Sequence, residues 1–169
     1  MIVENGTGLT DSNSYVSVVF ADDYFSARGV SGWVALTTEK KEQALIRATD
    51  FIDNIFQWCG KKASAEQALR FPRVNIRDYE GNVIEGIPTC LKQAVCDVAL
   101  VTSSGKELFE VAGENGDVVS ETITSLSFTY SKTERTTTSK TLYDSVNTKL
   151  RGLYVDSTKG HIQMGKMQR

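Results

Sequence analysis

The sequence predicts a mainly α-helical (α+β) protein, a compact bundle of about four to five helices with a small β-hairpin and an extended C-terminal tail. Three observations support this fold class. Apolar residues recur at spacings of three and four in several segments, which is typical of helices that bury one face. The segment at about 117–131 changes to a period of two, with β-branched and aromatic residues, which is typical of strands. From Tyr154 onward the chain is polar and contains Gly160 and Gly165.

The longest predicted helix begins at Thr37 or Thr38 and runs to about Phe56. Its apolar stripe is wide enough for a core-facing helix, and it consists of Leu45, Ala48, Thr49, Ile52, Ile55 and Phe56. Asp50 and Asp53 lie one turn apart on the same helix, a spacing that suits acid–base work or a metal ion. Because charged residues on an amphipathic helix usually face water, we expect both to belong to a solvated polar face.

Further helices are expected at 18–28, 64–69, 88–103 and 141–150. Ser17 is the expected N-cap of the first, and Pro72 ends the chain segment that contains the second. The segment 75–87 is expected to be a loop or a weak hairpin, and 131–139 a flexible loop because it contains no apolar residue. We therefore expect one helical domain over 1–153, with the hairpin at about 117–131, followed by a tail over 154–169 that is extended or ordered by a partner.

Composition is that of an ordinary globular protein, with 40% hydrophobic and 24% charged residues among 169. No apolar run approaches the roughly 18 residues of a membrane span, so no membrane partner is expected. Cys59, Cys90 and Cys96 lack the spacing of a zinc site and are expected to be small core residues in a reducing compartment. No cofactor, metal site or catalytic group is indicated, so we expect a protein that is not an enzyme.

Charge is distributed unevenly along the chain. The formal net charge is −2, but the segment from Lys132 to the C-terminus carries +5 and the preceding 131 residues carry −7. A basic C-terminal segment on an acidic body suggests a negatively charged partner, and a solubilising tail explains it equally well.

One group of residues is a candidate for nucleic-acid contact. A base could stack on Trp58 with phosphates near Lys61 and Lys62, as in proteins that bind single strands. Lys149 and Arg151 are further candidates in the basic segment. More often such a tryptophan closes one end of the core while the lysines are solvated, and we expect that arrangement here.

Several short segments, in this order and spacing, resemble a known family. They are Glu4-Asn5-Gly6-Thr7-Gly8-Leu9, Ser14-Tyr15-Val16-Ser17, Ala21-Asp22-Asp23-Tyr24, Arg28-Gly29, Arg47-Ala48-Thr49-Asp50-Phe51-Ile52-Asp53, Gln67-Ala68-Leu69-Arg70-Phe71-Pro72-Arg73, Ile87-Pro88, and Ser120-Glu121 through Leu126-Ser127 to Tyr130. Over residues 2–131 the chain resembles head–tail connector (adaptor) proteins of tailed bacteriophages, of the group labelled DnaT-like single-stranded DNA-binding protein.

The resemblance implies a structural virion protein of the neck, without catalytic residues or cofactors, that is made in the host cytoplasm. It implies a homo-oligomeric ring, typically of twelve copies, that joins the portal protein to a tail or second neck protein and lets encapsidated DNA pass through its channel. Expected portal or subunit contacts are Leu153, Tyr154, His161, Ile162, Met164, Phe128 and Tyr130. The alternative is a single-stranded DNA-binding protein that acts in phage replication.

Overall fold

The computed structural model describes residues 1–78, 80–105, 118–123, 126–131 and 137–155, with side chains described in 1–78, 80–105 and 142–155. This part of the chain is mostly helical with a small antiparallel hairpin, which confirms the predicted fold class. The helices are α1 (Val18–Ser26), α2 (Ser31–Val34), α3 (Thr38–Ile55), α4 (Thr89–Ser103) and α5 (Thr137–Leu150). The strands are β1 (Lys61–Lys62), β2 (Arg73–Val74), β3 (Val118–Ile123) and β4 (Leu126–Ser131).

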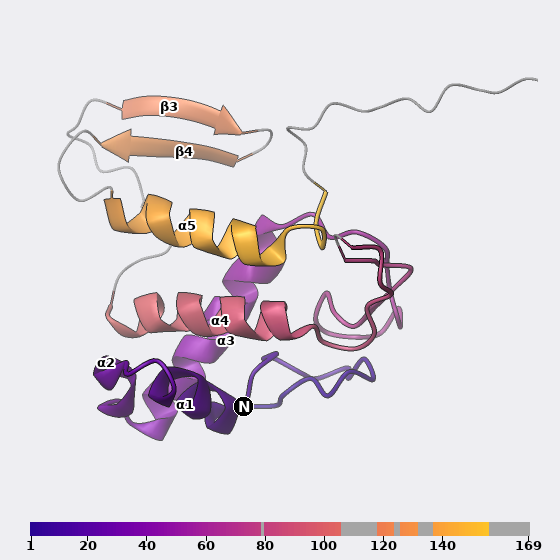
Figure 1. Cartoon of the computed structure of the whole chain (residues 1–169), viewed down its shortest axis with the longest axis horizontal. Coiled ribbons are helices and arrows are strands. Elements are labelled where there is room, and N and C mark those ends of the chain that lie inside the picture. Colours follow the sequence, from indigo (N-terminus) through magenta and orange to yellow (C-terminus); the bar gives the residue numbers. More distant parts are fainter. Residues whose placement is uncertain (79, 106–117, 124–125, 132–136, 156–169) are drawn as a thin grey trace, which may run out of the picture.

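Helix α3 is the central element, and α4 packs against it. The Thr37 hydroxyl caps α3 by accepting a hydrogen bond from the backbone N–H of Lys40, as the sequence predicted. Leu45, Ala48 and Ile52 are fully buried on the predicted stripe of α3. The facing residues of α4 are also fully buried, and they include Leu91, Ala94, Val95, Val98 and Ala99. Figure 1 shows α4 and α5 lying side by side, with α3 crossing behind α4 and with α1 and α2 below.

An ion pair holds α5 on the other helices. The Lys149 ammonium donates hydrogen bonds to the Asp97 carboxylate on α4 and, at 3.1 Å, to the Tyr24 hydroxyl on α1. Tyr24 in turn donates to Asp97 at 2.8 Å. Burial alone would lower the pKa of Lys149, but its hydrogen bonds to Asp97 and Tyr24 raise that pKa above the usual value. Three helices distant in sequence therefore meet at one charged cluster.

The predicted hairpin at 117–131 is confirmed in its backbone. Strand β3 pairs antiparallel with β4 in a register that runs from Val118 opposite Ser131 to Ile123 opposite Leu126. The side chains of Phe128 and Tyr130 lie outside the described residues.

The prediction of a helix at 64–69 is wrong, because the Gln67 side chain bridges the backbone on both sides of this segment and holds it as a loop. The Gln67 amide oxygen accepts from the N–H of Ser64, and its NH₂ group donates to the carbonyls of Leu69 and Pro72. The N–H of Ala68 donates instead to the carbonyl of Leu9 at 2.9 Å. A buried glutamine thus replaces the helix as the organiser of this loop.

Two further helix boundaries differ from expectation. Residues 137–139, predicted to be loop, form the first turn of α5, while 132–136 lie outside the described residues. Thr and Ser lower helix propensity by only a fraction of a kcal/mol, so packing of the following turns on α4 is enough to extend the helix. The short helix α2, which holds the buried Trp33, was expected as a loop.

Candidate nucleic-acid interface

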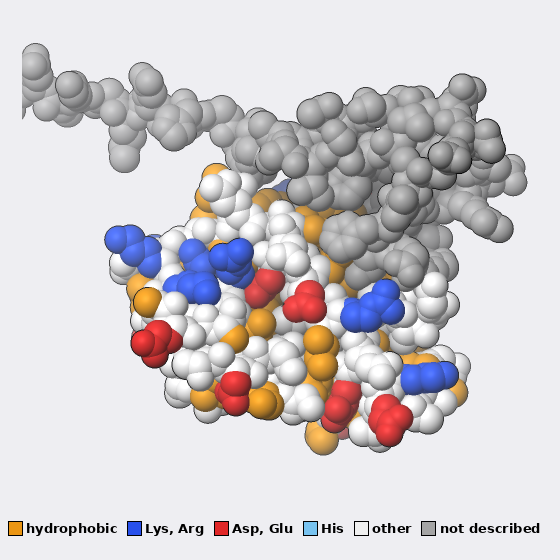
Figure 2. Space-filling view, turned by 180° about the vertical axis from the view of Figure 1, so that it is seen from behind, with side chains coloured by type: hydrophobic (Ala, Val, Ile, Leu, Met, Phe, Trp, Pro, Cys, Tyr) orange, Lys and Arg blue, Asp and Glu red, His pale blue; other side chains and the backbone are white. Residues whose placement is uncertain are grey.

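The segment 57–77, between α3 and α4, is locally rich in basic residues. Residues 57–77 include five basic side chains and a single acidic one, Glu66. We call these five basic residues the basic ribbon; they are Lys61, Lys62, Arg70, Arg73 and Arg77. The loops that contain them gather at one end of the helices, on the right in Figure 1. Figure 2, which is turned by 180°, shows Lys and Arg side chains close together at the corresponding end, on the left.

Strands β1 and β2 form the rigid centre of the basic ribbon. They pair antiparallel, with Lys62 opposite Arg73 and Lys61 opposite Val74. Directly opposite residues project from the same face of a pair, so Lys62 and Arg73 share one face and Lys61 extends from the other. Gly60, with φ +69°, precedes β1, and a Cβ at this position would lie 2.4 Å from the carbonyl oxygen of Val74. Only glycine allows this close approach of the two chains.

Arg73 holds the ribbon together through backbone carbonyls. Its Nε donates to Cys59 at 2.5 Å, and its terminal nitrogens donate to Gly60 at 2.8 Å, Trp58 at 3.4 Å and Arg70 at 3.2 Å. The planar guanidinium offers five N–H donors in a fixed geometry, which suits it to joining several carbonyls at once. Arg73 therefore positions the ribbon rather than offering a free charge.

The other four basic residues differ in how accessible their charges are. Lys61 and Arg70 are exposed. Lys62 is half-buried and donates to the carbonyl of Gln67 at 3.0 Å, and exposed Arg77 donates to the carbonyl of Gly81 at 2.7 Å. Lys61 and Arg70 are thus the charges best placed to contact phosphates.

A partly buried hydrogen-bond cluster fixes the backbone beside Arg70. The Asp53 carboxylate accepts from the Tyr15 hydroxyl at 2.7 Å and from the N–H of Arg70 at 2.9 Å. The same hydroxyl accepts from the N–H of Phe71 at 3.0 Å. Burial raises the pKa of Asp53 to about 6, although these hydrogen bonds act in the opposite direction. The expectation that Asp53 faces water is therefore wrong, while Asp50 is exposed as expected.

The chain after α5 returns to the ribbon. The N–H of Cys59 donates to the carbonyl of Leu153 at 2.9 Å, and the N–H of Val155 donates to that of Gln57 at 2.7 Å. Between them, Tyr154 forms an antiparallel bridge with Trp58. Residues 153–155 thus lie along the segment that leads into β1, so Tyr154 and Val155 belong to the folded body.

Trp58 is a core residue in the structure. It is 7% exposed, and its ring lies 5.0 Å from that of Phe71 and 5.5 Å from that of Phe56, between centroids. An indole enclosed in this way does not present a face to a nucleobase, which contradicts stacking on Trp58. Among the described side chains, its Nε1–H is a buried donor without a hydrogen-bond partner.

The remaining predicted site residues are dispersed. Lys149 is engaged with Asp97 and Tyr24, and Arg151 is exposed just after α5. Of the predicted portal contacts, Leu153 is buried and Tyr154 is half-buried against Phe56, with ring centroids 4.7 Å apart. His161, Ile162 and Met164 lie outside the described residues, as do the side chains of Phe128 and Tyr130.

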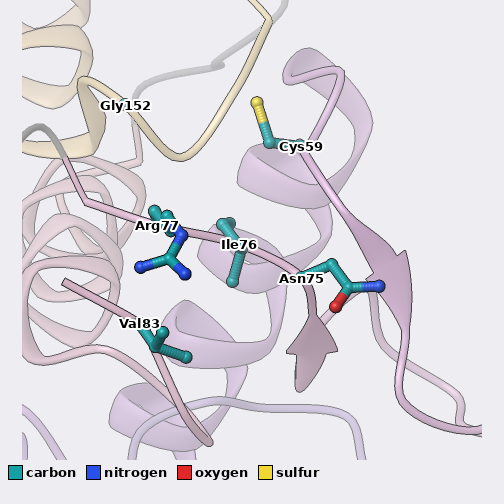
Figure 3. Close-up of a pocket in the computed structure, with 6 residues that line it drawn as sticks. All are labelled: Cys59, Asn75, Ile76, Arg77, Val83 and Gly152. Carbon is teal, nitrogen blue, oxygen red and sulfur yellow. The ribbon is translucent and has the colours of Figure 1, made fainter. Parts of the chain in front are cut away.

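A pocket of about 410 Å³ opens where the ribbon strands end. Its lining residues are Cys59, Asn75, Ile76, Arg77, Val83 and Gly152. In Figure 3, Ile76 lies near the middle of the group with Arg77 beside it, Cys59 and Gly152 lie on one side, and Val83 lies on the other. The Asn75 side chain points away from the others.

Sequence reasoning missed Arg70, Arg73 and Arg77 as members of the site. A signal was present, since five of the 21 residues at 57–77 are basic, but the ribbon pairing brings together residues about 12 positions apart through strands of only two residues. Within the described residues, no group of three or more His, Cys, Asp or Glu side chains is placed to hold a metal ion. No described helix is long and apolar enough to cross a membrane.

Comparison with curated proteins and with solved structures finds no match. A protein-family model, by contrast, matches residues 1–169. Its description names binding of single-stranded DNA and no portal, ring or connector. The expectation of a virion connector is therefore corrected in favour of its alternative, while the location and the remaining partner expectations stay predictions. The chain belongs to the family described as "Putative DnaT-like ssDNA binding protein".

Proposed function

We propose that this protein binds single-stranded DNA through the basic ribbon, with Lys61 and Arg70 contacting phosphates. The observation that carries the proposal is the pairing of β1 with β2, which holds exposed Lys61 in β1, while Arg73 of β2 binds the carbonyls of Gly60 and of exposed Arg70. Membership of a family described by single-stranded DNA binding supports it.

Charge segregation in the rest of the chain would direct a strand to this ribbon. Residues 1–56 contain eight acidic and four basic side chains, and residues 78–131 contain nine acidic and two basic ones. A DNA backbone is repelled by such regions and attracted to a local excess of lysine and arginine. The negative body therefore leaves the ribbon and the basic segment after residue 131 as the regions that attract a strand.

The residues of the ribbon have separate tasks in this proposal. Lys61 and Arg70 neutralise phosphates, whereas Arg73 holds the carbonyls of Cys59 and Gly60 so that β1 keeps its course. The Asp53 carboxylate accepts a hydrogen bond from the N–H of Arg70 and thereby fixes the position of the Arg70 backbone. Binding carried by phosphate contacts is tolerant of sequence and weakens steeply with salt.

The test is fluorescence anisotropy of a labelled oligothymidine at several salt concentrations. Two exposed cations are removed together in Lys61→Ala/Arg70→Ala, and the matched control Lys40→Ala/Arg47→Ala removes two exposed cations from α3. Loss of two phosphate contacts should reduce the slope of log affinity against log salt by about 1.4 for a single strand. The control should keep the slope of the unchanged protein.

Two results would contradict the proposal. One is the absence of binding by the unchanged protein at low salt. The other is an equal loss in the ribbon variant and in the α3 control, which would indicate non-specific attraction to the overall charge. Circular dichroism of each variant verifies that the helical body has folded.

A further inference from the structure

We infer that the pocket beside the ribbon receives one unpaired nucleobase of the bound strand. This inference rests on the proposed function and adds a cause for preferring single strands. A base in a duplex is stacked and paired, so only an unpaired base can turn aside into such a pocket.

Position is the first argument. The pocket is lined by Cys59 and Asn75, which lie one residue before Gly60 and one residue after β2. The carbonyl of Cys59 is itself held by Arg73 of the ribbon, at 2.5 Å. If the phosphates of a strand lie along β1 and β2, the next nucleotide of that strand therefore lies beside the opening of the pocket.

The lining suits the two chemical parts of a nucleotide. Exposed Val83 and half-buried Cys59 offer apolar surface to the face of a base, whereas Ile76 of the lining is buried. The Arg77 guanidinium lies beside Ile76 and offers a positive charge, or a planar surface on which a base can stack. A volume of about 410 Å³ falls within the range of small-ligand pockets and exceeds that of a single base.

Three contacts keep the pocket formed without a ligand. Arg77 forms an antiparallel bridge with Val83, and its guanidinium donates to the carbonyl of Gly81 at 2.7 Å. On the other side, the N–H of Cys59 donates to the carbonyl of Leu153, next to Gly152. A pocket held open in this way loses little conformational entropy when a base enters.

The deciding experiment compares two single strands of equal length and charge, oligothymidine and a fully abasic deoxyribose-phosphate strand. Stacking of a base on a protein surface strengthens binding, so we expect the unchanged protein to bind oligothymidine roughly tenfold more tightly. Val83→Trp, which fills the pocket from an exposed position, should remove this preference and leave binding of the abasic strand unchanged. Val19→Trp is the matched control, because it adds an exposed indole on α1, outside both the ribbon and the pocket lining, and it should keep the preference of the unchanged protein.

The outcomes separate this inference from the proposed function. Equal affinity of the unchanged protein for both strands overturns the pocket inference and leaves phosphate binding by the ribbon standing. A tenfold preference that persists in Val83→Trp also overturns it. Failure of the unchanged protein to bind either strand contradicts the proposed function itself.

Discussion

The hydroxyl oxygen of Tyr15 lies 2.7 and 2.9 Å from the two carboxylate oxygens of Asp53, a residue 38 positions further along the chain. The same hydroxyl accepts a hydrogen bond from the N–H of Phe71. Asp53 also accepts from the N–H of Arg70. The Tyr15 hydroxyl and the Asp53 carboxylate thus connect the N-terminal segment and α3 to the loop that leads into β2. Because a carboxylate is involved, the stability of this connection should depend on pH.

We expect the free energy of unfolding to fall as pH rises from about 4 to about 6. Burial raises the pKa of Asp53 from 3.8 to about 6, so within this window the folded state binds more protons than the unfolded state. Ionisation of Asp53 above the window costs stability, by at most roughly 3 kcal/mol at 1.36 kcal/mol per pKa unit. Urea unfolding at pH 4.5 and pH 7 measures the effect. Asp53→Asn should remove this part of the slope, and an unchanged slope would contradict the assignment.

Removing the charge of Lys149 should weaken the packing of α5 on its neighbours and lower the free energy of unfolding. Lys149→Met leaves the Asp97 carboxylate without its cation, and we expect a loss of about 1–2 kcal/mol because both side chains are partly exposed. Chemical denaturation provides the measurement, with Arg151→Ala as an exposed control near the same helix end that should change stability by less than about 0.5 kcal/mol. Since Lys149 is engaged within the fold, its loss should leave the salt dependence of DNA binding unaltered.

Trp58→Phe distinguishes a core residue from a stacking surface. The ring contacts Phe56 and Phe71 inside the body, so we expect unchanged affinity for oligothymidine and a loss of about 1 kcal/mol in stability. The loss should be modest because the buried indole N–H has no hydrogen-bond partner to forfeit. Anisotropy and thermal unfolding measure the two quantities. A tenfold drop in affinity with normal stability would contradict the core assignment and show that Trp58 contacts the DNA.

Glu4 should stabilise the N-terminal turn in a pH-dependent way. Its buried carboxylate accepts the N–H groups of Gly6, Gly8 and Leu9 and the hydroxyl of Ser12. Burial alone would raise the pKa of Glu4, but these hydrogen bonds lower it, so the stabilisation is present above about pH 4.5 and is lost as pH falls further. Glu4→Gln should cost about 1–3 kcal/mol at pH 7 and much less at pH 3, as measured by denaturation at both values.

The long helices could be predicted from the sequence because their signals are local. The Thr37 cap and the stripe through Leu45, Ala48 and Ile52 specify α3 within a single segment, and the structure confirms them. The period of two similarly located β3 and β4. Periodicity and capping depend on near neighbours, so one sequence is enough to recognise them.

The candidate site could not be predicted in the same way. Its strands are two residues long, too short for any period to appear. The Gln67 side chain holds a loop in place of an expected helix by bonding three residues of that loop, and Asp53 binds Tyr15 of a distant segment. Trp58 was expected to close one end of the core and does so, but its contact with Phe71 could not be read from the sequence. Each of these outcomes depends on a long-range or side-chain contact that no local pattern encodes.

The hydrogen bond from the N–H of Val155 to the carbonyl of Gln57 also determines the point from which the last 14 residues of the chain extend. Lys159, Lys166 and Arg169 follow an anchor point two residues beyond Leu153, whose carbonyl is bound to the segment leading into β1. At about 3.5 Å per residue, the C-terminus stays within roughly 50 Å of that point. Under the proposed function, these cations would be tethered within reach of a strand on the ribbon, as a second binding element is.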